Sequence, residues 1–382
     1  MKSICAVIGS RANYASIKSV LKSVKENKNL DLKIIAIASS VLERYGNVTT
    51  IMAKDGFKPN FILHSLIEGE NPKTMAMSTG LGLIELSNIF DQIKPDCVLT
   101  IGDRYETMST VIAASYMNIC IAHTMGGEVT GTIDESIRHA ITKFAHIHFP
   151  SNLDSAKRIT KLGENKKHVY NVGCPRIDLV KEILKNKKPN LKNFFNTGVG
   201  NKLDLSKPFL LVSQHPVTTE YGKEEDNILE TFEAIKKTQL PAIILWPNSD
   251  AGSNDISRGI RKWRENNKYD KFYYFKNLDI SDYIQLMNST VCLVGNSSSG
   301  IREGAFIGTP VVNIGSRQNN RLMGKNVLNV TINKDNIYSA IIKQIKRGKY
   351  KSQTIYGDGT AGKKIAKILE KANPSIQKTI TF

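Results

Sequence analysis

Cysteine is scarce in this sequence. The 382 residues include only five cysteines, no two of which form a CxxC pair, and most of them lie within apolar runs. An odd number of unpaired cysteines excludes a small disulfide scaffold and is typical of buried, free thiols in a reducing compartment. The five are Cys5, Cys97, Cys120, Cys174 and Cys292.

Common cofactor-binding signatures are also missing. The sequence has neither the GxGxxG fingerprint of dinucleotide-binding domains nor the GxxxxGK[ST] P-loop, which disfavours nicotinamide cofactors and P-loop hydrolysis of nucleoside triphosphates. His139, His146 and His148 have neither the HExxH spacing nor cysteine partners, which disfavours a metal site. We therefore expect no cofactor and no metal.

Long hydrophobic runs are absent as well. No segment approaches 18 consecutive apolar residues, and the apolar stretch at residues 4–8 is too short for the core of a signal peptide. These absences predict a cytoplasmic protein without a membrane partner.

Positive charge, by contrast, is plentiful. Lys and Arg number 53 against 35 Asp and Glu, a formal net charge of +18, which raises the question of a nucleic-acid partner. Forty of the 53 are lysines spread along the chain, whereas base readout and bidentate phosphate recognition depend mainly on arginine. The pattern favours a solvated, lysine-rich surface with no nucleic-acid partner, and it is compatible with a small polyanionic substrate.

Short β-rich runs alternate with amphipathic helical patterns along the chain. This alternation is typical of parallel α/β architecture, and 41% hydrophobic residues are enough for two cores. We predict a Rossmann-like domain over residues 1–180, a second over residues 205–358, and a C-terminal helix within 359–382. This helix could pack back on either domain, and we favour the first. The predicted strands are residues 4–8, 32–38, 97–101, 119–124 and 169–172 in the first domain, and 209–213, 242–246, 272–275, 291–294 and 310–314 in the second.

Two strand-to-helix turns are suited to binding an anion. The first predicted strand is followed by Gly9, Ser10 and Arg11, and the serine-rich run at residues 295–303 follows a strand of the second domain. The N–H groups and dipole of a helix N-terminus favour negative charge, so the second turn suits a diphosphate, with Glu303 placed to bind ribose hydroxyls. Simple N-capping by serine, and an incidental arginine in an exposed turn, are the alternatives.

Three acidic groups could carry proton transfer in the first domain. Asp103 and Glu128 stand beside glycines at the ends of predicted strands, and Asp134 with Glu135 opens a helix. Clustered, partly buried carboxylates raise one another's pKa towards neutrality, which suits acid–base work. For Asp134 and Glu135 the alternative is a capping box that begins at Thr132.

Polar residues also follow the strands of the second domain. His215, Asn248 and Arg317 each come shortly after a predicted strand, where side chains reach the usual ligand position of α/β domains. We interpret His215 as functional because of this position.

Six motifs, taken in order, resemble those of the hydrolysing UDP-N-acetylglucosamine 2-epimerases. This family includes the bacterial sialic acid pathway enzymes and the epimerase half of a bifunctional animal enzyme. Each motif is weak alone, but the ordered set is specific, and the similarity extends from Arg11 to about Arg321. The motifs are GDRYE at 102–106, GGE at 126–128, GTIDESIRHAITK at 131–143, QHP at 214–216, NSDAGS at 248–253 and GNSSSGIRE at 295–303.

The resemblance implies a fold, a reaction and a set of site residues. The fold is glycosyltransferase-B-like, with two Rossmann-like domains, the active site in the cleft between them and a homo-oligomeric assembly, either dimer or tetramer. The reaction converts UDP-N-acetylglucosamine into N-acetylmannosamine and UDP through a 2-acetamidoglucal, for nonulosonic (sialic-type) acid biosynthesis. The implied catalytic residues are Asp103, Glu128, Asp134 and His215, and the implied UDP-binding residues are Arg11, Arg104, His215, Asn248, Asn296, Ser297, Ser298, Glu303 and Arg317.

Other substrates and reactions stay open at the level of sequence. Relatives that act on UDP-N,N'-diacetylbacillosamine, in the legionaminic acid route, share all of these motifs. A non-hydrolysing UDP-N-acetylglucosamine 2-epimerase typically lacks the GDRYE run at 102–106. A glycosyltransferase of the same fold would not need three clustered acidic groups.

Overall fold

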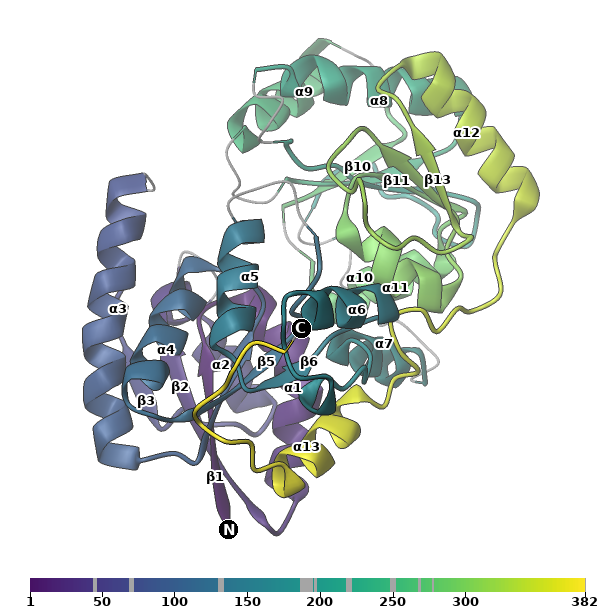
Figure 1. The fold of residues 1–382 in the computed structure, drawn as a ribbon. Coiled ribbons are helices and arrows are strands. Elements are labelled where there is room, and N and C mark those ends of the chain that lie inside the picture. Colours follow the sequence, from purple (N-terminus) through teal and green to yellow (C-terminus); the bar gives the residue numbers. More distant parts are fainter. Residues whose placement is uncertain are drawn as a thin grey trace. The chain divides into compact units, whose positions relative to one another are not determined.

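The chain folds into two compact α/β units (Figure 1). The computed structural model describes residues 1–43, 47–68, 72–129, 134–185, 195, 198–217, 222–247, 252–266, 269–276 and 278–381. Among these, unit 1 comprises the described residues of 1–129, 134–179 and 357–381, and unit 2 comprises those of 180–356. No helix in the described part of the chain is long and apolar enough to cross a membrane.

Unit 1 is built on a parallel sheet. Its described strands follow the order β3-β2-β1-β4-β5-β6, which is the strand order of a Rossmann fold. β1 pairs with β2 on one side and with β4 on the other, so the chain builds the sheet outwards in both directions from β1. The strands are β1 (Lys2–Ile8), β2 (Leu30–Ile37), β3 (Phe61–Leu63), β4 (Cys97–Ile101), β5 (Cys120–Thr124) and β6 (Ile147–Phe149).

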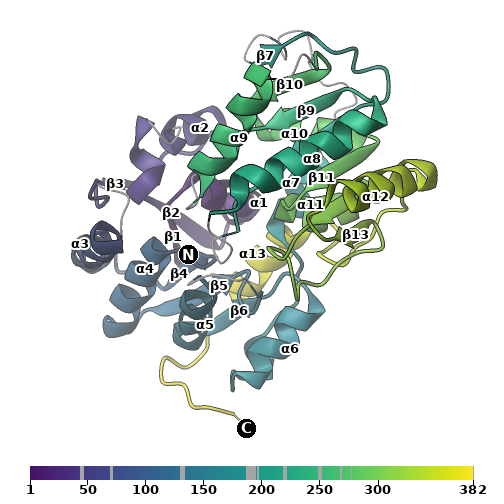
Figure 2. The same cartoon turned by 90° about the horizontal axis from the view of Figure 1, so that it is seen from above.

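Helices cover both faces of this sheet. Ile4, Ala6 and Ile8 of β1 belong to one apolar core, and Cys5 and Val7 belong to the core on the opposite face, because successive side chains of a strand alternate. Figure 2 shows α3, α4 and α5 along one side of the sheet. The helices on the first face are α1 (Arg11–Glu26), α2 (Val48–Lys54) and α13 (Ala361–Lys371), and those on the second are α3 (Pro72–Ile93), α4 (Tyr105–Tyr116) and α5 (Asp134–Phe144). The remaining elements up to the second unit are η1 (Ala38–Val41), α6 (Leu153–Lys161), η3 (Lys166–His168) and α7 (Pro175–Lys185).

Unit 2 repeats the design with a second sheet. Its described strands follow the order β13-β12-β11-β8-β9-β10-β7, all parallel except β7, which pairs antiparallel with β10. Helices α8, α9 and α12 share one apolar core with the sheet, and α10 and α11 lie on its other face (Figure 1). The strands are β7 (Val199–Gly200), β8 (Leu210–Ser213), β9 (Ala242–Leu245), β10 (Phe272–Phe275), β11 (Cys292–Gly295), β12 (Val311–Ile314) and β13 (Val327–Val330), and the helices are α8 (Glu224–Thr238), α9 (Ser253–Asn266), α10 (Ile280–Ser289), α11 (Ser298–Ile307) and α12 (Lys334–Arg347).

The predicted strands coincide with observed strands except at residues 169–172. There Val169 forms only an isolated bridge with His148, and the strand at this edge is β6, which the sequence prediction missed. The segment ends at Gly173, whose φ of +88° precedes the start of α7 at Pro175. The prediction also missed β3, β7 and β13, which are very short or partly exposed and so lack a long apolar run.

The C-terminal helix α13 is an integral part of unit 1. Ile365 and Leu369 are fully buried in the core that α13 shares with α1. The carboxylate of Asp178 accepts hydrogen bonds from the N–H groups of Ala361 and Gly362 at 3.0 and 2.7 Å, which caps the helix N-terminus. Both apolar burial and capping therefore fix α13 on this unit.

Replacing Ile365 by alanine tests how much this packing stabilises unit 1. We expect Ile365→Ala to lower the free energy of unfolding by about 2–5 kcal/mol, the range for deleting a fully buried aliphatic side chain. Urea denaturation followed by circular dichroism measures the loss. Ile380→Ala is the matched control, because Ile380 is 58% exposed and its truncation should change stability little. Equal losses in the two variants would contradict the packing of α13.

Candidate active site

The first predicted site residues of unit 1 follow β1 and β4, the neighbouring strands from which the chain extends the sheet in opposite directions. β1 and β4 are neighbours in the sheet although β2 and β3 separate them in the chain. The carboxyl ends of two such strands are the usual ligand position of doubly wound sheets. Arg11 follows β1, and Asp103 and Arg104 follow β4, so the predicted anion site and the first predicted carboxylate share one edge of the sheet.

The turn before Arg11 is fixed by short-range hydrogen bonds. The Ser10 hydroxyl accepts from the N–H of Asn13 at 3.2 Å, and the Asn13 side chain accepts from the N–H of Gly9 at 3.2 Å. A Cβ on Gly9 would lie 2.2 Å from Cγ of Glu106, so no larger residue fits at this position. Arg11 is the first residue of α1, whose first turn holds no acidic residue, and this arrangement favours a bound anion.

A buried arginine ties two predicted catalytic segments together. The guanidinium of Arg138, on α5, forms an ion pair with the carboxylate of Asp103 and donates to the carbonyl oxygen of Glu128 at 2.9 Å. The side chain of Arg138 is 4% exposed and that of Asp103 is 23% exposed. Since one guanidinium contacts the turns after both β4 and β5, Asp103 and Glu128 are held close to each other.

The Glu128 carboxylate is buried and oriented. The Ser151 hydroxyl donates to its Oε1 at 2.5 Å. Gly127, just before it, has φ +72°, and a Cβ there would lie 2.5 Å from the carbonyl oxygen of Ser155, so only glycine fits this turn. Arg158 also donates to the Gly127 carbonyl oxygen. The acid is therefore presented on a rigid backbone.

His123, on β5, supports the turn that carries Asp103. Its Nε2 lies 2.8 Å from the carbonyl oxygen of Gly102, and because a carbonyl only accepts, this nitrogen carries the proton. Burial lowers the pKa of His123 to about 4, so the ring is neutral at pH 7. A neutral imidazole thus fixes the backbone directly before Asp103.

Arg104 pairs with a buried acid that the sequence prediction did not single out. Its Nε donates to Oε1 of Glu106 at 2.8 Å, and Glu106 is only 4% exposed. The charge of Glu106, assisted by that of Asp134, raises the pKa of Arg104. The other carboxylate oxygen of Glu106 is buried and has no hydrogen-bond partner among the described residues. Asp134, the first residue of α5, thus lies within the electrostatic reach of Arg104.

Unit 2 has the same topology at its predicted nucleotide site. β8 and β11 are neighbours although β9 and β10 separate them in the chain, and His215 and Asn296 follow these two strands. The Asn296 side chain accepts from the N–H of His215 at 2.7 Å and donates to its carbonyl oxygen at 2.8 Å. Asn296 is 3% exposed. The structure therefore gives Asn296 a backbone-tying role that the sequence prediction, which named it for UDP binding, did not foresee.

The serines at the start of α11 have partners within the helix. Ser297 is the N-cap, and its hydroxyl accepts from the N–H of Ser299 at 3.4 Å. The Ser298 hydroxyl accepts from the guanidinium of Arg302 at 3.1 Å. The N-capping alternative thus describes Ser297 in this structure, and it leaves the backbone N–H groups of the first turn as the anion-binding feature.

The other predicted residues of unit 2 lie around the same turn. Arg317 donates to the carbonyl oxygen of Asn296 at 3.3 Å, and Gln318 donates to the same oxygen at 2.8 Å. Glu303 is 2% exposed on α11. The turn after β12 is therefore tied to the turn after β11.

The structure groups the predicted residues by unit. Asn248 lies outside the described residues. The roles of the others in catalysis and UDP binding stay predictions. Unit 1 holds Arg11, Asp103, Arg104, Glu128 and Asp134, and unit 2 holds His215, Asn296, Ser297, Ser298, Glu303 and Arg317.

Sequence reasoning missed four supporting residues of unit 1. Arg138 lies within a quoted motif and one helical turn after Asp134, a spacing that could have placed both on one face of α5. Glu106 ends the GDRYE motif. Ser151 and His123 carry no such signal, because their partners Glu128 and Gly102 are distant in the sequence.

The fold and these strand-end sites define a class. Two Rossmann-like units with parallel sheets make this a protein of the glycosyltransferase-B-like fold. Residues 22–370 match the family described as UDP-N-acetylglucosamine 2-epimerase, and the chain belongs to this family.

Individual relatives align with most of this chain. A UDP-N,N'-diacetylbacillosamine 2-epimerase (hydrolyzing) of Legionella pneumophila is 31% identical over 97% of this chain and 96% of its own length. A GDP/UDP-N,N'-diacetylbacillosamine 2-epimerase (hydrolyzing) of Campylobacter jejuni is 33% identical over 87% of this chain and 85% of its own. The crystal structure of UDP-GlcNAc 2-epimerase from Neisseria meningitidis bound to UDP-GlcNAc superposes with a TM-score of 0.82 at 17% identity, over 97% of this chain and 100% of that one.

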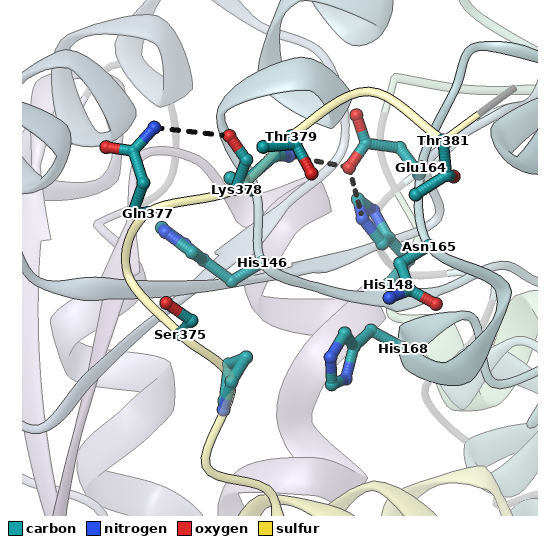
Figure 3. A pocket seen from close by; sticks show the side chains of 11 residues that line it. His146, His148, Glu164, Asn165, His168, Ser375, Gln377, Lys378, Thr379 and Thr381 are labelled. Atoms are coloured by element: carbon teal, nitrogen blue, oxygen red, sulfur yellow. Dashed lines mark hydrogen bonds and ion pairs between the residues drawn. The ribbon is translucent and has the colours of Figure 1, made fainter.

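A second polar cluster of unit 1 holds the C-terminal tail (Figure 3). The ammonium of Lys378 donates to the carbonyl oxygens of Lys143 and Ala145, at 2.7 and 2.5 Å, and to Oε2 of Glu164 at 2.6 Å. Lys143 donates to the other Glu164 oxygen at 2.5 Å, and His148 Nε2 lies 3.2 Å from Oε2. The cluster borders a cavity of about 130 Å³. Lys378 therefore binds the tail to the C-terminal end of α5.

Two histidines of this cluster, His146 and His148, are neutral at pH 7, and its acid is ionised. His146 accepts from the N–H of Ile121 at 3.1 Å and donates to the carbonyl oxygen of Ile376 at 3.0 Å, so a proton on its accepting nitrogen would break one bond. Burial lowers the pKa of both His146 and His148. Although burial opposes it, hydrogen bonds from His148 and the two lysines lower the pKa of Glu164 to about 2.

This lowered pKa predicts acid-sensitive stability. Glu164 should stabilise the fold fully above its unfolded pKa of about 4.5, and the stabilisation should fall with pH towards the folded value of about 2. The whole contribution is about 3 kcal/mol, of which about 1 kcal/mol is lost at pH 3.5. We expect Glu164→Gln to flatten this part of the pH dependence, as measured by denaturant unfolding between pH 6 and 3.5. The exposed Glu265→Gln is the control, and parallel pH profiles in all three proteins would exclude the role of Glu164.

Proposed function

We propose that this chain is a hydrolysing 2-epimerase that converts UDP-N-acetylglucosamine into N-acetylmannosamine and UDP. The observation that carries the proposal is the Arg138 contact with both Asp103 and the Glu128 backbone, which gathers two strand-end acids near each other. The names of the Legionella and Campylobacter relatives, both hydrolyzing 2-epimerases, support the same reaction.

The first step is an elimination. A carboxylate of unit 1 takes the proton from C2 of the sugar, the C1–O bond breaks, and its electron pair leaves with UDP to give a 2-acetamidoglucal. The C2 proton is weakly acidic, so stabilisation of the leaving diphosphate makes its removal feasible. Arg11 at the start of α1, and the N–H groups at the start of α11, are suited to this charge.

The second step hydrates the glycal. Water adds its oxygen to C1, and a proton returns to C2 from the opposite face, which releases a sugar of inverted configuration at C2. One acid must give the proton and another must activate the water. Asp103, Glu128 and Asp134 supply three candidates, and Ser151 and Arg138 orient two of them.

Unit 2 supplies the nucleotide site in this proposal. In it, Ser297 and Ser298 meet the diphosphate together with the first turn of α11, and the Glu303 carboxylate accepts hydrogen bonds from the ribose hydroxyls. The site is lined by His215, Asn248 and Arg317. Support comes from Asn296, which ties His215 to the start of α11, and from Arg317, which contacts the same turn.

The second candidate substrate is UDP-N,N'-diacetylbacillosamine. Relatives of 31% and 33% identity carry this substrate in their names, so the reaction would be the same on a 4-acetamido-6-deoxy sugar. Incubation with each UDP-sugar, with the product identified by NMR, decides between the two. Either product places the chain in a nonulosonic acid route, in which a homo-oligomer is the expected form.

Removing the two acids tests their catalytic role. We expect Asp103→Asn and Glu128→Gln each to lower turnover at least about a hundredfold, because an acid–base group typically contributes 10²–10⁴-fold. UDP affinity, measured by calorimetry, should stay nearly unchanged. Asp91→Asn on the exposed side of α3 is the control and should keep full activity. Near-native turnover in both active-site variants would remove these acids from the mechanism.

Deuterium incorporation tests the elimination itself. Cleavage of the C2–H bond requires that turnover in deuterated water place deuterium at C2 of the released sugar, which proton NMR detects. A glycosyltransferase or a simple hydrolase does not break this bond. Free sugar of the original C2 configuration without deuterium would overturn the hydrolysing epimerase, and UDP-N-acetylmannosamine as the final product would indicate the non-hydrolysing reaction.

A further inference from the structure

A half-buried tyrosine contacts the start of α11, where the proposed diphosphate site lies. Tyr283 belongs to α10, which packs beside α11 on one face of the unit 2 sheet (Figure 1). Its hydroxyl is 2.5 Å from the Ser299 hydroxyl, which in turn is 2.8 Å from the hydroxyl of the N-cap Ser297. The sequence prediction did not single out Tyr283.

Two further serine hydroxyls lie near the same phenol. Although burial raises the pKa of Tyr283, the hydroxyls of Ser299, Ser297 and Ser213 lower it. Ser213 ends β8, and its Oγ lies 3.4 Å from Nε2 of His215. Tyr283 therefore extends the chain of hydroxyls at the start of α11, and Ser213 and His215 of the turn after β8 lie nearby.

Such a chain is directional because each hydroxyl has a single proton to donate. Burial raises the pKa of Tyr283, so the phenol keeps its proton at neutral pH. When Tyr283 donates its proton to Ser299, the Ser299 hydroxyl can donate to Ser297. The proton of Ser297 then points away from the network, towards a ligand at the helix N-terminus.

We propose that Tyr283 is a positioning residue of the nucleotide diphosphate site, where it orients the Ser299 hydroxyl and, through Ser299, that of the N-cap Ser297. This inference rests on the proposed function, and it adds a residue from α10, an element outside the quoted motifs. Tyr283 has no contact with the substrate in this role. It acts through the serines.

The variant Tyr283→Phe removes the hydroxyl and keeps the ring. We expect the dissociation constant for UDP, measured by calorimetry, to rise about fivefold to tenfold, the effect of a net loss of about 1 kcal/mol. In the bound state the ³¹P resonance of the UDP β-phosphorus should move, while the uracil proton resonances stay in place. Unchanged urea denaturation would show that the fold is intact.

Two comparisons separate positioning from a general loss of structure. Tyr269→Phe removes a phenol that donates to the Leu240 carbonyl oxygen at 3.3 Å, elsewhere in unit 2, and should leave UDP binding and its ³¹P spectrum unchanged. Ser299→Ala should weaken UDP binding, and the double variant with Tyr283→Phe should bind no more weakly than the weaker single variant, because both changes break one network.

The outcomes distinguish this inference from the proposed function. If the natural protein binds UDP and Tyr283→Phe binds it within twofold with the same ³¹P spectrum, the positioning role is wrong and the function stands. Additive effects of Tyr283→Phe and Ser299→Ala would also overturn it. If the natural protein binds no UDP at all, the nucleotide site and the role of Tyr283 fail together.

Discussion

A parallel sheet brings the carboxyl ends of all its strands to one edge, and every candidate site in this chain depends on that constraint. In unit 1 the strand order places the turns after β1, β4 and β5 in succession, and in unit 2 it places those after β8 and β11 side by side. The strands are buried on both faces, since alternate residues of β1 belong to two separate apolar cores. Charged side chains are therefore found mainly at the ends of the strands.

Turns that meet at one edge still need to be fixed to each other, and in each unit a buried side chain joins two of them. In unit 1 the guanidinium of Arg138 joins the Asp103 and Glu128 turns, and in unit 2 the amide of Asn296 joins the His215 turn to α11. The charge of each of these two side chains suits the groups that it contacts. A cation suits a turn that presents a carboxylate, whereas a neutral amide can satisfy both a backbone donor and a backbone acceptor without adding charge.

The sequence predicted the architecture because buried parallel strands appear as continuous apolar runs that end in glycine and polar residues. It could not predict β6, because the buried strand Ile147–Phe149 has a histidine at its centre, and the run it belongs to alternates histidines with apolar residues. Burial lowers the pKa of His146 and His148, so rings that a sequence pattern counts as polar are neutral in the fold. The supporting residues Ser151 and Tyr283 escaped prediction because their partners lie 23 and 16 residues away along the chain and meet them only through packing.

The strong positive charge of the chain and its candidate sites act at different ranges. A net charge of +18 attracts any anion through the solvent and is screened beyond about 10 Å at 0.1 M salt, so it can raise an association rate but cannot choose a substrate. Several of the cations nearest the buried acids already have partners, since Arg138 pairs with Asp103, Arg104 with Glu106 and Lys378 with Glu164. In the proposed function, selection of a nucleotide diphosphate therefore depends on oriented donors at helix N-termini. In unit 2 the Ser299 hydroxyl, in the first turn of α11, contacts the phenol of Tyr283.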